Sequence, residues 1–395
     1  MRVYADNAAT TKMSDIAIET MVSYMKNEYG NPSSLYEKGQ TALEAIERAR
    51  KSIAEVINSR PKEIYFTSGG SESDNQAIIT GAEIGKKKNK RHIITTAFEH
   101  HAVLHSLEKL KKQGFDITLL PVYEDGLVRP EDLEKALNEN TVMVSVMFAN
   151  NEIGTIQPIK ELGAICREKG VIFHTDAVQA LGHLKIDIEE MNIDMLSMSA
   201  HKFHGPKGVG ALFVRKGIRV SNLIEGGAQE KGKRAGTENV PGIMSMAAAL
   251  LESVNDMEEK GKGIASLRNQ LIEELIKIPH SKVNGSVIDR LPGNLNMCFE
   301  GIEGESLLLL LDDKGVSASS GSACTSGSLD PSHVLLAIGL PHEIAHGSLR
   351  ISLSEYSTKE DIKHIAKVVP EVVSYLRSIS PIWNDLKEGR KEYVI

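Results

Sequence analysis

Ser199-Ala200-His201-Lys202-Phe203-His204-Gly205-Pro206-Lys207-Gly208 is the stretch that most constrains the fold and the chemistry of this 395-residue chain. It lies between an apolar segment, Met195 to Met198, and a strand-like run, Val209 to Val214. A lysine amine whose pKa is lowered by desolvation or by a nearby cation can attack a carbonyl carbon. Lys202 is therefore a candidate for a Schiff base with an aldehyde cofactor, and a solvated lysine in a turn is the alternative.

The composition is that of an ordinary globular protein, with 41% hydrophobic residues, 25% charged residues and a formal net charge of −7. This acidic balance does not favour binding to nucleic acid or to an anionic membrane. The longest apolar run, Leu307 to Leu311, is too short to span a bilayer, and the N-terminus has no apolar signal core. Because Cys166, Cys298 and Cys324 are too few and too dispersed for a disulfide framework or a zinc site, we expect a reducing cytoplasm.

Strand and helix patterns alternate along the first half of the chain. Strands are expected over residues 63–67, 92–96, 116–122, 141–149 and 171–174, and helices from about 76, over 101–112, from about 129 and over 158–169. This alternation predicts an α/β fold with a mostly parallel sheet covered by helices on both faces. Ligands of such sheets bind beyond the carboxyl ends of the strands, where we expect Ser71, His100, Asn151, Asp176, Gln179 and Lys202.

A Gly/Ser turn, Ser68-Gly69-Gly70-Ser71, follows the first of these strands and precedes a helix. Free N–H groups and the helix dipole favour an anion at such a place, and glycine lets the backbone approach it closely. The turn is neither a Walker A loop nor a GxGxxG fingerprint, so a single phosphate is the expected ligand. A helix start capped by Ser71 is the alternative.

The pattern changes at about Asp256, where a long charged helix begins a second region. This region contains Ser319 to Ser328, a run of small residues without periodicity around Cys324, and we expect a mobile loop there. A cysteine on such a loop is a candidate nucleophile, and an idle surface thiol is the alternative. We expect a large domain over 15–255 and a small domain of 1–14 with 256–395, which carries the cysteine loop at about 317–330.

Several motifs coincide in this chain: Asp176-x-x-Gln179, Ser199-x-His201-Lys202, the Gly70-Ser71 turn, Glu99-His100 and the Cys324 loop. Together they resemble the group I cysteine desulfurases of the NifS/IscS type, within the class V aminotransferase family of fold-type I pyridoxal-phosphate enzymes. The likeness runs from Asp6 through Ser380. It implies a large domain with a mostly parallel seven-stranded sheet, a smaller α/β C-terminal domain, and pyridoxal 5′-phosphate as the cofactor.

The resemblance also implies a role for each matched residue. Lys202 would bind the cofactor covalently and move the substrate's α-proton, Asp176 would pair with the pyridinium nitrogen, and Gln179 would bond the phenolic oxygen. His100 would stack on the ring and serve in acid–base steps. The remaining polar positions would hold the two anionic groups: Gly70, Ser71, Ser199, His201 and, across a homodimer interface, Thr237 for the phosphate, and Asn151 and Arg350 for the substrate carboxylate. Asn151 would also contact the cofactor.

The implied activity removes sulfur from L-cysteine, giving L-alanine and a persulfide on Cys324. The persulfide sulfur would pass to a sulfur acceptor or iron–sulfur scaffold protein, for iron–sulfur assembly, nitrogenase maturation or thiolation of tRNA and cofactors. No resident metal is implied, and the one metal contact considered is a transient iron–sulfur cluster at Cys324. The C-terminal tail from Ser380 resembles the partner-docking region of the family and departs from it after about Lys387.

Other functions remain open from the sequence. A selenocysteine lyase would use the same fold and lysine, and another class V enzyme, such as an aminotransferase, would have no use for a loop cysteine. A catalytically silent scaffold would keep the fold and bind only partners. A metal-binding protein, from a different class, would use His101 and His105, which lie at i and i+4 on one helix face.

Overall fold

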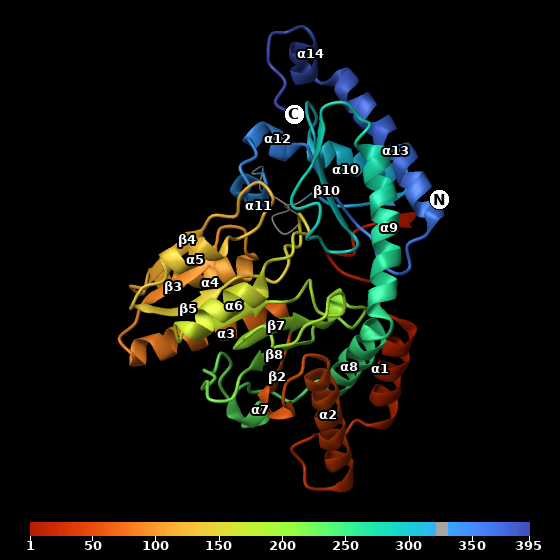
Figure 1. Ribbon diagram of the computed structural model, residues 1–395. Helices are drawn as coiled ribbons and strands as arrows, with labels where there is room; N and C mark the ends of the chain where they lie inside the picture. The colour runs from red at the N-terminus through yellow and green to blue at the C-terminus, as the bar shows by residue number, and fades with distance from the viewer. Residues whose placement is uncertain (321–330) are drawn as a thin grey trace.

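The computed structural model describes residues 1–320 and 331–395, which form two lobes joined by the long helix α9 (Figure 1). The larger lobe is built on a seven-stranded sheet in which only β8 runs antiparallel to its neighbours. This confirms the predicted α/β class and the mostly parallel seven-stranded sheet. In spatial order the strands are β2 (Ile64–Thr67), β8 (Gly210–Val214), β7 (Met195–Ser199), β6 (Ile172–Asp176), β5 (Thr141–Ser145), β3 (His92–Thr96) and β4 (Asp116–Leu120).

Helices cover both faces of this sheet, and the alternation of strand side chains explains why. On β7, Leu196 belongs to the core cluster shared with α2, α6 and α8, whereas the preceding Met195 belongs to the cluster shared with α3 and α4. Both faces are therefore apolar, as expected for buried parallel strands. The helices of this lobe are α1 (Asp15–Asn27), α2 (Glu37–Val56), α3 (Gly70–Lys87), α4 (His101–Lys111), α5 (Pro130–Ala136), α6 (Ile159–Glu168), α7 (Gln229–Gly232) and α8 (Val240–Val254), with the short 3₁₀ turns η1 (Pro61–Glu63) and η2 (Ala200–Lys202).

Helix α3 begins earlier than the sequence predicted. It starts at Gly70 rather than near Gln76, so the turn is confined to Ser68 and Gly69. Glu72 stabilises the early start, because its carboxylate accepts the N–H of Ser68 at 2.8 Å and sits near the positive end of the helix dipole. The expected strand over 141–149 is also shorter than predicted. It ends at Ser145, where the chain leaves the sheet and turns toward Asn150 and Asn151.

The smaller lobe combines the N-terminal strand with the last third of the chain. Its core cluster includes Val3 and Ala5 together with residues of α9, β10 and α13. The predicted domain limits, 15–255 and 1–14 with 256–395, stay a prediction, and α11 and α12 pack with the core cluster of the large lobe. In the small lobe, strands β12, β10 and β9 form an antiparallel sheet in that order, and β1 pairs with β11 in parallel. The elements of this part of the chain are β1 (Val3–Tyr4), α9 (Met257–Leu275), β9 (Ser281–Val283), β10 (Asn294–Phe299), α10 (Gly304–Asp313), β11 (Val316–Ser317), α11 (His333–Ala337), α12 (His342–His346), β12 (Ser348–Ser352), α13 (Lys359–Ile379) and α14 (Pro381–Lys387).

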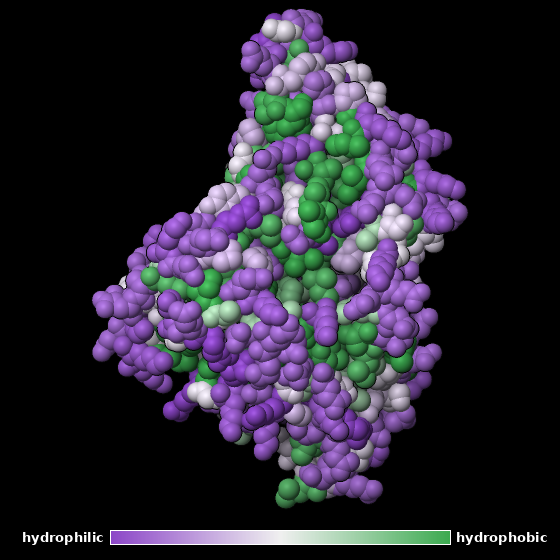
Figure 2. Space-filling model, viewed as in Figure 1, coloured by the Kyte–Doolittle hydropathy of each residue, from purple (hydrophilic) through white to green (hydrophobic). Residues whose placement is uncertain are grey.

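The face of the molecule in Figure 2 is mostly hydrophilic, and its hydrophobic side chains gather in the small lobe and along the junction between the lobes. Over residues 1–320 and 331–395, none of the helices combines the length and the apolar content that a bilayer crossing requires.

A buried ion pair holds the loop around α7 against α2 and β2. The guanidinium of Arg50 donates to both carboxylate oxygens of Glu230 at 2.8 Å, and the N–H of Phe66 donates to the same carboxylate at 2.9 Å. Arg50 and Glu230 are 3% and 5% exposed, so each charge depends on the other. Removing one partner of such a pair leaves an uncompensated charge in the interior.

Glu230→Ala is therefore expected to lower the free energy of unfolding by about 3–5 kcal/mol. The matched control is Glu47→Ala, because Glu47 also pairs with Arg50, at 3.0 Å, but has a 52% exposed side chain. That change is expected to cost less than about 1 kcal/mol. Urea unfolding of both variants measures the difference, and equal losses would contradict the importance assigned to the buried pair.

Candidate active site

A cavity of about 290 Å³ opens at the carboxyl ends of β6 and β7. Its walls come from segments that are far apart in the sequence, as expected where parallel strands end at one edge of a sheet. Most of the residues singled out from the sequence line this one cavity: Gly70, Ser71, His100, Asn151, Asp176, Gln179, Ser199, His201, Lys202 and Arg350.

One end of the cavity is formed by the first turn of α3. The N-cap residue Gly69 makes no side-chain capping bond, so the helix start is not capped by Ser71. A Cβ on Gly70 would come within 2.7 Å of Val178 Cγ2, so glycine allows the helix end to approach the loop after β6. Free N–H groups of a first helical turn and the positive dipole end favour an anion such as phosphate. Ser199 and His201 add polar groups to the same cavity.

Lys202 lies on η2, directly after β7, and its amine is held by the N-terminal segment. Nζ donates to the carbonyl oxygens of Ala8 at 2.6 Å and Ala9 at 2.7 Å. The side chain is only partly exposed and lines the cavity. The alternative of a solvated lysine in a turn is therefore wrong, because the amine is fixed by two backbone acceptors inside the cavity.

Asp176 ends β6 and is 5% exposed. Burial raises the pKa of its carboxyl to about 6, although the N–H of Val178, 2.9 Å from Oδ1, and the charge of Lys202 favour the ionised form. A carboxylate in such a place gains most from a cationic N–H partner, because a charge-assisted hydrogen bond offsets the cost of burial. A protonated pyridine nitrogen would be such a partner.

His100 is the N-cap of α4, and its Nδ1 accepts the N–H of Ala102 at 3.1 Å. Burial, with smaller contributions from the nearby cationic forms of Lys202, His101 and His105, lowers the pKa of the ring to about 4. The ring is therefore neutral near pH 7, and because Nδ1 is an acceptor its single proton sits on Nε2. In this form His100 is a hydrogen-bond donor to whatever occupies the cavity.

Arg350, on β12, brings the small lobe to the cavity and is 2% exposed. Its guanidinium donates to Asp6 at 2.8 Å and to the carbonyl oxygen of Asn151 at 3.3 Å. Its Nε is buried and has no hydrogen-bond partner within residues 1–320 and 331–395. An Arg fork with unused donors suits a carboxylate.

Gln179 donates to the carbonyl oxygen of Ala8 at 2.9 Å.

These residues fit a phosphorylated pyridine aldehyde. The cavity holds an amine for the aldehyde, a buried carboxylate for the ring nitrogen, and an uncapped helix end for the phosphate. Within the described residues Nε of Arg350 has no partner, which leaves a donor for a substrate carboxylate. Nothing in the lining chemistry opposes the predicted cofactor.

Thr237 does not line the cavity, since it is exposed on the loop between α7 and α8. Cys324 lies outside the residues that the structure describes. The sequence reasoning in turn missed five residues of the cavity wall. These residues are Ala8, Ala9, Asp74, Met147 and Val178. Ala8 and Ala9 act through backbone carbonyls and so give no side-chain signal, whereas Asp74 follows the Gly/Ser turn and could have been found from the sequence.

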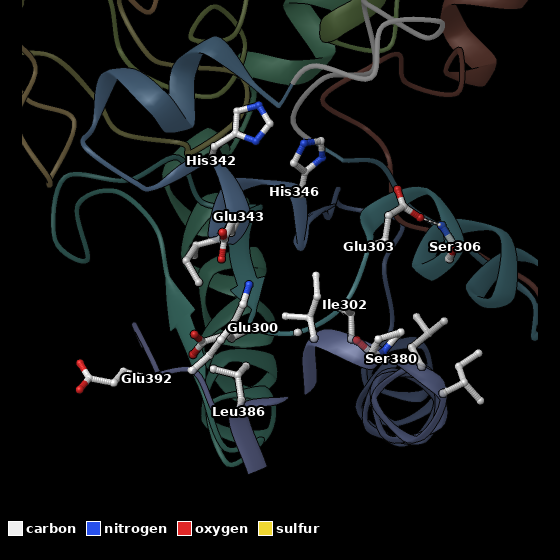
Figure 3. A pocket seen from close by; sticks show the side chains of 17 residues that line it. Glu300, Ile302, Glu303, Ser306, His342, Glu343, His346, Ser380, Leu386 and Glu392 are labelled. Carbon is white, nitrogen blue, oxygen red and sulfur yellow. Dashed lines mark hydrogen bonds between the residues drawn. The ribbon is translucent and has the colours of Figure 1, made fainter. Parts of the chain in front are cut away.

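A larger cavity, of about 510 Å³, lies in the small lobe among α12, α13 and α14. Figure 3 shows His342, His346 and Glu303 on one side of it and Ile302 and Leu386 on the other. Among the residues that the structure describes, no predicted site residue lines it. A third cavity is bordered by His101, His105 and His333, whose rings lie 4.6–4.9 Å apart in succession. In the described part of the chain, no group of three or more His, Cys, Asp or Glu residues is arranged to hold a metal ion.

Comparison with known proteins agrees with this geometry. Residues 3–365 match the family model of the aminotransferase class-V enzymes. Cysteine desulfurase IscS of Methanosarcina thermophila is 53% identical over 380 residues, which are 96% of this chain and 94% of that protein. Cysteine desulfurase IscS of Clostridium botulinum (strain Hall) is 51% identical over 394 residues, which are 99% of both chains.

The solved structures give the same result. A NifS-like protein superposes with a TM-score of 0.90 at 40% identity, covering 95% of this chain and 100% of the other. Enzymes of this family depend on pyridoxal 5′-phosphate, which the amine, carboxylate and helix end of the cavity fit. The chain therefore belongs to the aminotransferase class-V family and, within it, to the cysteine desulfurases.

Proposed function

We propose that this chain takes sulfur from L-cysteine, releases L-alanine and carries the sulfur as a persulfide on Cys324. The observation that carries the proposal is the convergence of Lys202, Asp176, His100 and Arg350 on one cavity of about 290 Å³. These four side chains supply the amine, the acid, the neutral donor and the carboxylate receptor that this chemistry requires. The relatives named cysteine desulfurase over nearly the whole chain support the same substrate.

Lys202 is the residue to bind the cofactor and to move the substrate's α-proton. Its ammonium is held at the carbonyls of Ala8 and Ala9, and it must lose a proton before it can bond to a carbonyl carbon. In its neutral form the amine would be a base at the same place. Pyridoxal phosphate, when bound, supplies the electron sink that makes the α-proton acidic.

Asp176 and His100 have complementary tasks. An ionised Asp176 keeps a proton on the cofactor's ring nitrogen, since separating the two would leave a buried carboxylate without a partner. His100, neutral with its proton on Nε2, donates a hydrogen bond to the bound group, and its unprotonated form can accept a proton in the acid–base steps.

Arg350 and Asn151 are proposed to hold the substrate carboxylate. The fork of Arg350 contacts Asp6 at 2.8 Å, so an entering carboxylate shares or replaces that contact and gains the free Nε donor. Because Arg350 comes from the small lobe and Lys202 from the large lobe, the substrate is bound at the junction between them. The backbone of Arg350 also exchanges two hydrogen bonds with Ser319, at 2.6 and 3.1 Å, near the start of the predicted cysteine loop.

The loop cysteine completes the reaction. The Cys324 thiolate would form a bond to the substrate sulfur while the carbon–sulfur bond breaks, and the electron pair of that bond stays with the carbon fragment, which then takes up a proton and leaves as alanine. Among the three cysteines, Cys166 and Cys298 are buried, and burial raises the pKa of the Cys298 thiol to about 12, which makes that thiol inert. The burial of these two thiols supports Cys324 as the proposed nucleophile.

The persulfide is proposed to pass to a sulfur acceptor or iron–sulfur scaffold protein, in a reducing cytoplasm. We also propose a homodimer in which Thr237, exposed in the single chain, reaches the phosphate in the neighbouring subunit. A selenocysteine lyase and an aminotransferase are the other outcomes that the experiments below distinguish.

Cys324→Ala is expected to bind the cofactor as the native chain does and to lose protein persulfide and at least roughly 10²-fold of its desulfuration rate. Intact mass and peptide mapping after incubation with L-cysteine, without reductant, measure the added sulfur. The peptides containing Cys166 and Cys298 are internal controls and should gain none. Full-rate desulfuration by the variant would contradict the nucleophile, and turnover of selenocysteine alone would indicate a lyase.

Arg350→Lys is expected to raise KM for L-cysteine roughly 10–100-fold, since a point charge cannot make the bidentate contact and a charge-assisted bond is worth about 1.5–3 kcal/mol. Cofactor affinity should be unchanged. Steady-state kinetics and a cofactor titration measure both quantities. If cofactor binding fell while KM stayed constant, Arg350 would belong to the cofactor site instead.

The His100 ring should remain uncharged at pH values well below 6.5, the ordinary pKa of a histidine side chain. Since its pKa in the folded state is about 4, against 6.5 for a free side chain, its contribution to stability is present above pH 6.5 and is lost as pH falls toward 4. The His100 ring ¹⁵N resonances are those that are lost in His100→Gln. In the native chain they should show a neutral ring with the proton on Nε2 between pH 6 and 8. A midpoint near 6.5, or a proton on Nδ1, would contradict this assignment.

A further inference from the structure

The part of the chain that contains Cys324 begins at one lobe and ends at the other. At its start, the backbone of Ser319 pairs with the backbone of Arg350 on β12, at 2.6 and 3.1 Å. At its end, α11 begins, and Val334 and Leu335 of that helix belong to the core cluster of the large lobe. Residues 320–331, here called the Cys324 segment, therefore connect the small lobe with the large lobe.

A buried carboxyl holds the downstream end of this segment. Ser332 is the N-cap of α11, and its Oγ accepts the N–H groups of Val334 at 3.1 Å and Leu335 at 3.3 Å. Because a hydroxyl has a single proton, Ser332 donates that proton to the carboxylate oxygen Oε2 of Glu152. Ser332 and Glu152 are 4% and 5% exposed, so solvent has little access to replace this bond.

Glu152 belongs to a turn that adjoins the candidate active site. Its N–H donates to Asn150 Oδ1 at 2.8 Å, and the amide of the fully buried Asn150 donates to the carbonyl oxygen of Phe98 at 3.0 Å. Asn151, between these two residues, lines the cavity, and its carbonyl oxygen accepts from the guanidinium of Arg350 at 3.3 Å. The turn that adjoins the proposed carboxylate site thus also holds the end of the Cys324 segment.

A second contact holds the first residue of α11. His333 Nε2 donates to the carbonyl oxygen of Glu99 at 3.0 Å, since a carbonyl oxygen can only accept. Glu99 immediately precedes His100, which lines the cavity. Both polar contacts of the segment end are therefore made to residues that are direct chain neighbours of cavity residues, Asn151 and His100.

The length of the chain makes these contacts important for Cys324. The cysteine lies five residues after Ser319 and eight residues before Ser332. A chain extends by at most about 3.6 Å per residue, so its sulfur reaches no farther than roughly 20–30 Å from either end. The place where each end is held thus decides how often the thiol meets a substrate in the cavity.

We propose that Glu152 is a positioning residue for sulfur transfer, which holds Ser332 beside the Asn151 turn and so keeps the Cys324 segment directed to the cavity. A correctly held nucleophile reacts at a high effective concentration, and a loosened one loses rate while substrate binding is retained. The inference rests on the proposed roles of Cys324 as the nucleophile and of Asn151 and Arg350 as the carboxylate site.

Single-turnover kinetics of the cofactor-loaded chain test this role. Glu152→Ala should lower the rate of persulfide formation on Cys324 at saturating L-cysteine roughly tenfold, because the hydrogen bond to Ser332 is lost. The half-saturating concentration of L-cysteine and the affinity for pyridoxal phosphate should stay within about threefold of the native values. Quenched samples analysed by peptide mass measure the persulfide.

Glu152→Gln separates the hydrogen bond from the charge. Its amide oxygen can still accept from Ser332, whereas the negative charge near Arg350 is removed. The rate should stay within about threefold of the native rate. Ser332→Ala should be as slow as Glu152→Ala, and the double variant should be no slower than either, since all three lack the same bond.

Glu63→Ala is the matched control for a general loss of stability. Glu63 is 7% exposed and accepts the N–H groups of Lys216 at 2.7 Å and Arg60 at 2.9 Å, but it does not line the cavity. This variant should be destabilised and should form persulfide at the native rate. An equal loss of rate in Glu63→Ala and Glu152→Ala would overturn the positioning role.

Hydrogen–deuterium exchange tests the contact without turnover. The peptide that contains Val334 and Leu335 should exchange roughly tenfold faster in Glu152→Ala and at the native rate in Glu152→Gln, because the two amides donate to Ser332. Unchanged exchange in Glu152→Ala would show that Glu152 does not hold this end of the segment, and would contradict the proposal.

The outcomes separate this inference from the proposed function. If the native chain forms persulfide on Cys324 and Glu152→Ala does so at the same rate, the role of Glu152 is wrong while that of Cys324 stands. If Glu152→Gln is as slow as Glu152→Ala, or if only the half-saturating concentration changes, Glu152 acts through its charge on the carboxylate site and the proposal is overturned. If the native chain forms no persulfide on Cys324, the proposed function fails and this role fails with it.

Discussion

The site depends on the contact between Lys202 and the backbone carbonyls of Ala8 and Ala9, 2.6 and 2.7 Å from its amine. The short N-terminal segment that provides these carbonyls begins in the core of the small lobe, at Val3 and Ala5, and passes the guanidinium of Arg350 at Asp6. The same carbonyl of Ala8 also accepts from Gln179. One stretch of backbone therefore connects the lysine of the large lobe with the arginine of the small lobe, and the cavity exists where the two meet.

The low dielectric of this junction then sets the charge state of each group. Burial raises the pKa of Asp176 to about 6 and lowers that of His100 to about 4, so the acid is ready to pair with a cation and the imidazole is neutral. Lys202 acts on both groups, favouring the carboxylate and disfavouring the imidazolium.

The sequence predicted those parts of the structure that local patterns determine. Residues His92–Thr96 form the expected strand because their β-branched side chains favour extended backbone. The strand-end residues lie close together because parallel strands end at one edge of the sheet. The start of α3 was missed, since it depends on Glu72, which accepts from Ser68 and pairs with the distant Arg234 at 2.9 Å. Ala8 and Ala9 were missed because backbone carbonyls leave no trace in side-chain chemistry, and the environment of Asp74 depends on how α3 packs over β6 and β7.

Chemical trapping of the cofactor tests the central assignment most directly. The purified chain, loaded with pyridoxal phosphate, is reduced with borohydride, digested and mapped by mass spectrometry. We predict that the reduced cofactor is found on the peptide that contains Lys202, and that the neighbouring Lys207, exposed on the following turn, is unmodified. Cofactor on another lysine, or on none, would contradict the site built around the Ala8 and Ala9 carbonyls.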